Sequence, residues 1–129
     1  MPVAVEVPLD GDSIEAFCVR AMDFTRSLPG SLAASVTLPD SLPPADRRRA
    51  ELLAEHLEYG VVAINTWSAL AYALGSVPWG GYPGATLAEP KSGIGRVHDP
   101  LLLPLVHNTL LRAPLAAWPM PAWFAWHRQ

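Results

Sequence analysis

Apolar and polar positions follow two different periods along the first 65 residues. Residues 3–7 (VAVEV) and 32–38 (LAASVTL) alternate residue by residue, as half-buried strands do. Residues 61–65 (VVAIN) form an apolar run that ends in asparagine, which is typical of a strand buried on both faces. The pattern predicts three strands, the first of them near an edge because Pro2 and Pro8 flank it.

Between these strands, apolar residues recur every three or four positions and predict two amphipathic helices. The first follows Asp12, which can cap it while Glu15 reaches back to the cap amide, and it ends near Ser27. The second spans residues 44–58, with a proline in the first turn, where a missing amide proton costs little. We expect Gly60 to end it as a left-handed cap.

The order strand, helix, strand, helix, strand predicts the α/β class: a small open, largely parallel β-α-β-α-β sheet with helices packed on it, and then a loop-rich C-terminal region. Three strands leave the sheet edges uncovered, which indicates a piece of something larger. Further along, the pattern predicts a short helix at 68–74, a turn-rich loop at 78–84 and a last strand at 106–111.

Length and composition favour one domain with a real core. The chain has 129 residues, half of them apolar, and its 14 prolines keep much of it out of regular structure. We divide it into residues 1–112, the folded portion, and a tail at 113–129 that is rich in proline and tryptophan. The tail aromatics are Trp118, Trp123, Phe124 and Trp126.

Charge and cysteine content indicate which partners to exclude and in which cellular compartment to expect the protein. The formal net charge is -3 and the one basic cluster is Arg47–Arg49, so we expect no nucleic-acid partner. A single cysteine, Cys18, fits a reducing compartment, and the N-terminus lacks a secretory pattern. We therefore expect a cytoplasmic protein.

A membrane span is the alternative for residues 61–77, a run long enough to cross a bilayer core. Asn65 and Thr66 would lie inside it, and Gly75 and Pro78 break a helix in it or just beyond it. We expect no membrane partner and favour a core strand followed by a short helix or loop.

Catalytic and metal-binding patterns are weak. His56, His98, His107 and His127 lack a partner at a metal-ligand spacing, so we expect surface or hydrogen-bonded histidines. Cys18 lies on the apolar side of the first helix with no activating neighbour, as a structural thiol would. The glycine pairs form no phosphate-binding G-x-G-x-x-G element.

Three ordered elements nevertheless carry a family resemblance: YGVVAIN at 59–65, PWGGYPG at 78–84 and KSGIG at 91–95. Behind the strand–helix pattern they resemble the C-terminal part of the catalytic domain of the aldehyde dehydrogenase superfamily, in a divergent branch. The resemblance implies that residues 1–112 are this portion of the catalytic domain. The long spacer before Pro78 and the inserted PGATLAEP depart from the usual form.

By this resemblance, Asn65 ends the family's strand, and the aldehyde pocket is lined by Asn65, Thr66, Trp67 and Trp79. The alternative for the last three is core packing. Gly80 and Gly81 match the aromatic-Gly-Gly turn, and Ser92 and Gly93 match the Ser-Gly pair. In the family the C-terminal end joins a neighbouring subunit's sheet, and residues 106–111 are the comparable segment.

The family's nucleophilic cysteine, general-base glutamate and dinucleotide domain have no counterpart in this sequence. The resemblance thus implies a C-terminal fragment or isolated domain of an NAD- or NADP-dependent oxidoreductase that has no catalytic residue, cofactor site or metal site alone. Its partner would be a missing N-terminal enzyme portion or other copies in a homo-oligomer. The alternative is a non-enzymatic oligomerising module built on the same half-fold.

Overall fold

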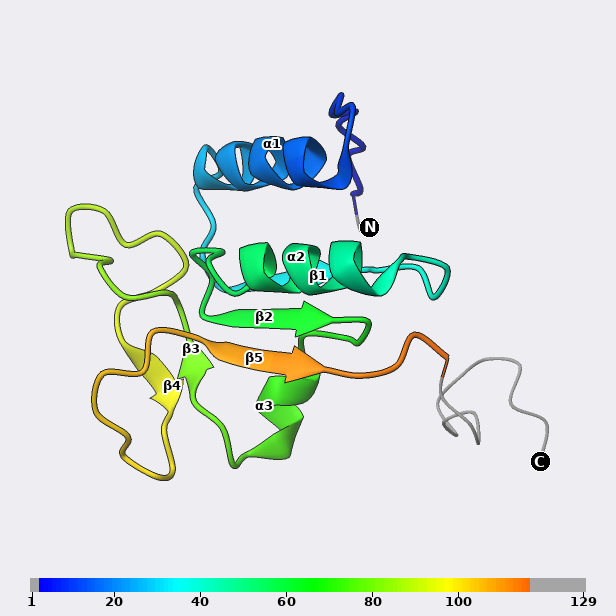
Figure 1. Ribbon diagram of the computed structural model, residues 1–129. Helices are drawn as coiled ribbons and strands as arrows, with labels where there is room; N and C mark the ends of the chain where they lie inside the picture. The colour runs from blue at the N-terminus through cyan, green and yellow to red at the C-terminus, as the bar shows by residue number, and fades with distance from the viewer. Residues whose placement is uncertain (1–2, 117–129) are drawn as a thin grey trace.

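The structure is a computed structural model that describes residues 3–116. Its order of elements is helix, strand, helix, strand, short helix and three further strands (Figure 1). The bounds are α1 (Ile14–Arg26), β1 (Ala33–Val36), α2 (Pro44–Ala54), β2 (Val61–Ile64), α3 (Leu70–Leu74), β3 (Trp79–Gly80), β4 (Arg96–His98) and β5 (Thr109–Arg112).

A three-stranded parallel sheet in the order β1-β2-β5 is the centre of the molecule. Val61 at the start of β2 pairs with Ala33 on one side and with Thr109 on the other. This confirms a mixed α/β chain with a small, open, parallel sheet and helices. A separate antiparallel pair, β3-β4, lies beside the β5 side of the sheet.

The third strand of the sheet is not the predicted one. Residues 3–7 form no strand, and Val3 is 84% exposed, so that prediction was wrong. Its place is taken by β5, which confirms a last strand near 106–111 but pairs it with this chain's own β2. An alternating segment becomes a half-buried strand only when a neighbouring strand pairs with it. The sequence does not show which alternating segment finds such a partner.

The two long helices begin and end close to the predicted positions. Ser13, not Asp12, caps α1, because its Oγ accepts the Ala16 amide at 3.1 Å, and the C-cap is Ser27 as expected. Helix α2 starts at Pro44 but ends at Ala54, four residues before the predicted end. The chain then tightens into three-residue turns, with Leu57 N donating to Ala54 O at 3.1 Å.

The main core lies between the sheet and the two helices, which pack side by side on the same face (Figure 1). Its buried members alternate along β2, where Val62 and Ile64 point toward the helices. Val61 and Ala63 point to the opposite face and are just as buried. The core residues are Leu38, Ala50, Ala54, Leu57, Tyr59, Val62 and Ile64.

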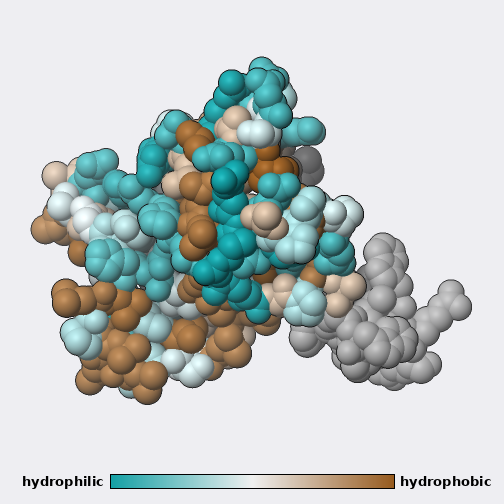
Figure 2. Space-filling view, in the orientation of Figure 1, coloured by the Kyte–Doolittle hydropathy of each residue, from teal (hydrophilic) through white to brown (hydrophobic). Residues whose placement is uncertain are grey.

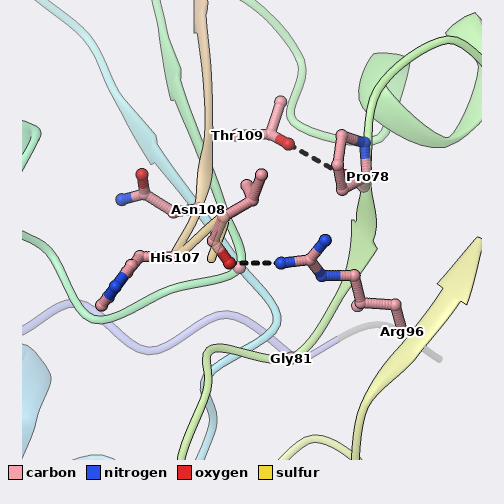
Figure 3. A pocket seen from close by; sticks show the side chains of 9 residues that line it. Pro78, Gly81, Arg96, His107, Asn108 and Thr109 are labelled. Carbon is pink, nitrogen blue, oxygen red and sulfur yellow. Dashed lines mark hydrogen bonds between the residues drawn. The ribbon is translucent and has the colours of Figure 1, made fainter. Parts of the chain in front are cut away.

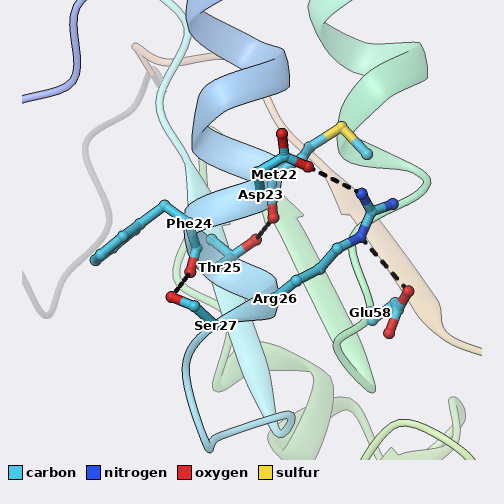
Figure 4. A network of polar contacts seen from close by, with 7 residues as sticks. All are labelled: Met22, Asp23, Phe24, Thr25, Arg26, Ser27 and Glu58. Atoms are coloured by element: carbon cyan, nitrogen blue, oxygen red, sulfur yellow. Dashed lines mark hydrogen bonds and ion pairs between the residues drawn. The ribbon is translucent and has the colours of Figure 1, made fainter.

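Polar contacts hold the C-terminal end of α1 to the chain before β2 (Figure 4). Arg26 bridges Asp23 at 3.2 Å and Glu58 at 3.6 Å. All three side chains are about half exposed or more, so each ion pair contributes at most about 1 kcal/mol. The helix is therefore held mainly by its apolar contacts with α2 and the core.

The short helix expected at 68–74 is confirmed as α3, which ends at the left-handed Gly75. The loop expected at 78–84 contains the short strand β3 as well. In the part of the chain that the structure describes, no helix is long and apolar enough to cross a membrane. The Pro/Trp-rich tail predicted from residue 113 falls, from residue 117 on, outside the described residues.

Replacing Ile64 with Ala tests the central position of β2. Ile64 is 2% exposed, and its truncation leaves a cavity that should lower the free energy of unfolding by about 2–5 kcal/mol in urea denaturation. Ile94→Ala is the matched control, because Ile94 is 53% exposed and its loss should change stability by less than about 0.5 kcal/mol. Equal effects of the two substitutions would contradict this arrangement of the core.

Candidate functional site

The turn residues singled out in the sequence meet around Ser31, next to the amino ends of β1 and β2. The Ser31 carbonyl accepts the Gly60 amide at 2.9 Å and the Tyr82 amide at 3.0 Å. The Ser31 amide donates to Ser92 Oγ at 2.6 Å. The segments at Gly60, Tyr82 and Ser92 therefore all bond one residue, Ser31. We call the surrounding cluster (Ser31, Gly60, Gly80, Gly81, Ser92, Gly93) the junction.

Glycine is required in the junction because backbones approach closely there. A Cβ on Gly60 would lie 1.8 Å from the Gly80 carbonyl oxygen, and one on Gly81 would lie 2.9 Å from the Gly93 oxygen. Gly60 does not have a positive φ, so the prediction that it acts as a left-handed helix cap was wrong. Because Gly60 has no side chain, β3 can pack closely against the start of β2.

Residues 83–90, which lie between the two glycine turns, close on themselves. Thr86 N donates to Glu89 O at 3.0 Å, and Glu89 N donates to Thr86 Oγ1 at 3.1 Å. Gly81 and Gly93, on either side of this segment, approach each other closely. Residues 83–90 therefore form a surface turn between two parts of the junction.

Arg96 and Thr109 line the side of the junction that faces β5 (Figure 3). Arg96 donates to the Val106 carbonyl and forms an ion pair with Asp99. Thr109 Oγ1 donates to the Pro78 carbonyl at 2.8 Å, which fixes β3 under the sheet. The space left among these groups is about 10 Å³, which is room for one water molecule.

Asn65 lies at the opposite end of β2, where its polar groups complete the sheet. It has a left-handed backbone with φ of 56°, its amide donates to Val36 O at 2.9 Å, and its Oδ1 accepts the Leu38 amide at 2.7 Å. Asparagine tolerates this conformation better than most residues. Asn65 thus joins the ends of β1 and β2 through its backbone amide and its side-chain oxygen.

The predicted pocket residues do not form one group. Thr66 and Trp67 follow the carboxyl end of β2, and Trp67 is 68% exposed, so it does not fill core volume. Trp79 belongs to β3, which adjoins the amino end of β2 through Gly60 and Gly80, and it packs edge-on against Tyr72 with ring centroids 5.7 Å apart. The length of β2 therefore separates Trp67 from Trp79.

Within residues 3–116, the side chains that could act in catalysis do not gather at one place. Cys18 is partly buried on α1, and burial raises the pKa of its thiol, which is the reverse of an activated nucleophile. Burial likewise raises the pKa of Tyr59. Within residues 3–116, no three His, Cys, Asp or Glu side chains gather as metal ligands would, and His127 lies outside this range.

Ser31 in the junction and Arg96 beside it were not predicted from the sequence. Ser31 is buried, yet a serine after Pro-Gly resembles any loop residue, so the sequence carries no signal for it. Arg96 did carry one, because Arg96 and Asp99 are the only charged residues between Lys91 and Arg112. A cation and an anion three residues apart in an apolar stretch indicate a half-buried pair, as is found.

Comparison with protein-family models, curated proteins and solved structures gave no match to this chain.

A substitution at Gly60 tests whether close approach defines the junction. Gly60→Ala puts a methyl group into the Gly80 carbonyl and should lower the midpoint of thermal unfolding by several degrees, since about 1–3 kcal/mol of strain shifts it that far. Gly30→Ala is the control: the added Cβ would lie 3.6 Å from Ser92 Oγ, an ordinary contact, and φ is not positive there. A Gly60→Ala protein as stable as Gly30→Ala would rule out the close approach.

Proposed function

We propose that this chain is the C-terminal portion of the catalytic domain of an aldehyde-dehydrogenase-like oxidoreductase from a divergent branch, and that it does not turn over substrate alone. The observation that supports this most directly is the junction. Residues chosen from three separate sequence elements, Gly60, Gly80, Gly81, Ser92 and Gly93, meet around one buried serine. A chance likeness in three short segments would not require them to meet.

The chemistry of the described residues agrees with a supporting role. The junction is made of backbone amides and carbonyls that bond one another, and Arg96 is occupied by Asp99 and Val106. Catalysis of aldehyde oxidation needs a thiolate nucleophile and a bound nicotinamide cofactor. In this proposal a second polypeptide portion brings the nucleophile and the NAD or NADP site, and this chain supplies part of the substrate pocket through Asn65, Thr66 and Trp67.

Reconstitution tests the proposal. The purified chain should produce no NADH or NADPH from an aldehyde alone, and should do so when mixed with a portion of a family dehydrogenase that carries the dinucleotide domain and the nucleophile. In the mixture, Trp67→Ala should lower kcat/KM several-fold, because a pocket side chain contributes about 1–3 kcal/mol to substrate selection. The matched control is Leu87→Ala, which alters a side chain that is 93% exposed and distant in sequence from the pocket residues.

Two outcomes of the reconstitution would contradict the proposal. Turnover by the chain alone would show that the missing groups are not needed. The proposal would also be wrong if the chain formed no complex and gave no activity with any of the enzyme portions tried.

A second candidate function, an oligomerising module, is favoured by one specific surface. Residues 100–105 (PLLLPL), which we call the leucine loop, follow β4 and are largely exposed. Figure 2 shows apolar side chains gathered at the lower left, over β4 and this loop. Exposed apolar patches of this kind mark interaction sites in soluble proteins.

The leucine loop is held in one shape at both ends. Arg96 binds the Asp99 carboxylate before it and the Val106 carbonyl after it. Leu102 and Leu105 have positive φ values of 47° and 59°, a conformation that costs of order 1–3 kcal/mol for a bulky residue. A preformed loop loses little entropy when it binds, so this geometry suits contact with a second copy of the chain.

Light scattering after size exclusion tests the second candidate. The chain should elute as a homo-oligomer, and the double substitution Leu102→Glu and Leu105→Glu should return it to the monomer, because charged groups oppose burial in an apolar interface. These side chains are 83% and 91% exposed, so the monomer should keep its thermal stability. Leu87→Glu in another loop is the control and should leave the oligomer intact; a monomeric unsubstituted chain at high concentration would exclude this function.

A further inference from the structure

An apolar groove of about 290 Å³ lies between α1, β1 and α2. Its lining includes Phe17, Cys18 and Met22 from α1, Val36 from β1 and Leu53 from α2, and none of the described lining residues is charged. The volume approaches that of small-molecule pockets and exceeds the cavities that well-packed cores tolerate. Unlike the junction, this groove has room for large side chains.

Helix α1 is incompletely packed as a result. All of its residues are described, and none is buried, although Ile14, Cys18 and Met22 touch the core. Phe17, at the groove, stays 45% exposed. A 13-residue helix is marginal in water unless its apolar face is covered, so further apolar contact at the groove would stabilise α1.

The chain beyond the described residues carries large apolar side chains of the kind that could fill this groove. Thirteen residues, 117–129, follow Ala116, and Trp123, Phe124 and Trp126 are close to one another in their sequence. The sequence from Ala113 to Trp126 carries no charged side chain. An uncharged aromatic segment and an uncharged groove match in chemistry, because burying each removes apolar surface from water.

The chain length is also sufficient. The chain leaves β5 at the carboxyl edge of the sheet, and the groove extends along β1 to Thr37 at the same edge. Two strand spacings, about 10 Å, separate β5 from β1, and the groove lies one layer above the sheet. The seven residues from Ala116 to Trp123 span about 22 Å in the extended form that prolines favour, whereas the two to Trp118 span about 6 Å.

We propose that residues 123–126 of this chain dock their aromatic side chains in its own groove between α1, β1 and α2. A segment joined to the same chain acts at an effective concentration of about 1 mM, which exceeds the usual concentration of other copies. This inference does not depend on the enzymatic proposal, since it concerns only how the chain covers its own apolar surface.

Cys18 provides the measurement, because it is the only cysteine and it lines the groove. A segment that binds with a dissociation constant of about 0.1 mM, at an effective concentration of about 1 mM, covers the groove roughly ten times more often than it leaves it open. Replacing Trp123, Phe124 and Trp126 together with Ala should therefore raise the rate of Cys18 reaction with a maleimide roughly tenfold. Trp118→Ala is the matched control and should leave the rate unchanged; an unchanged rate in the triple variant would overturn the proposal.

A disulfide trap distinguishes the chain's own tail from other occupants. Phe124→Cys treated with diamide as oxidant should form a disulfide with Cys18 within one chain, seen as a faster monomer band on a non-reducing gel. Trp118→Cys should not form it. A covalent dimer would assign the groove to a second copy's tail, and absence of any disulfide would mean that the segment does not reach the groove; either result overturns the proposal.

Discussion

Burial of β2 on both faces is the constraint on which the rest of the molecule depends. Its four residues, Val61–Ile64, are all buried, and both of its edges are paired. Such a strand needs cover on two sides, since buried backbone groups must be bonded and buried side chains packed. The helices α1 and α2 cover one face, and the chain around Pro78, whose carbonyl accepts a hydrogen bond from Thr109 of β5, lies on the other.

The two ends of β2 are completed by different devices. At its start, Gly60 lets the Gly80 backbone come so near that no side chain fits, and Ser31 and Ser92 bond the surrounding loops. At its end, the side-chain oxygen of Asn65 accepts a hydrogen bond from the Leu38 amide, two residues after β1. The residues that carry the family resemblance therefore bond and pack the two ends of β2 in this chain.

Uncovered apolar surface is the other general property of the described chain. It appears at the leucine loop, where Leu102 and Leu105 are exposed, and at the groove beside Phe17 and Cys18. Neither surface arises from poor local structure: Arg96 holds the loop, and α1 is capped at both ends. Both surfaces thus combine bonded local structure with apolar side chains left in water, and this is why we propose a contact at each of them.

The sequence by itself determined the local elements. Periodicity located α1, β1 and the start of α2, and the run of apolar residues identified β2 as fully buried, because these signals depend only on neighbours along the chain. Tertiary structure alone decided which strand completes the sheet: residues 3–7 alternate convincingly but have no partner, and β5, a hundred residues later, pairs with β2. It also decided that Gly60 packs against the Gly80 backbone and that Ser31 bonds the segments at Gly60 and Tyr82. It likewise placed Trp67 and Trp79 at opposite ends of β2. Each of these depends on contacts between segments far apart in sequence, where the pattern of single residues carries no information about distance.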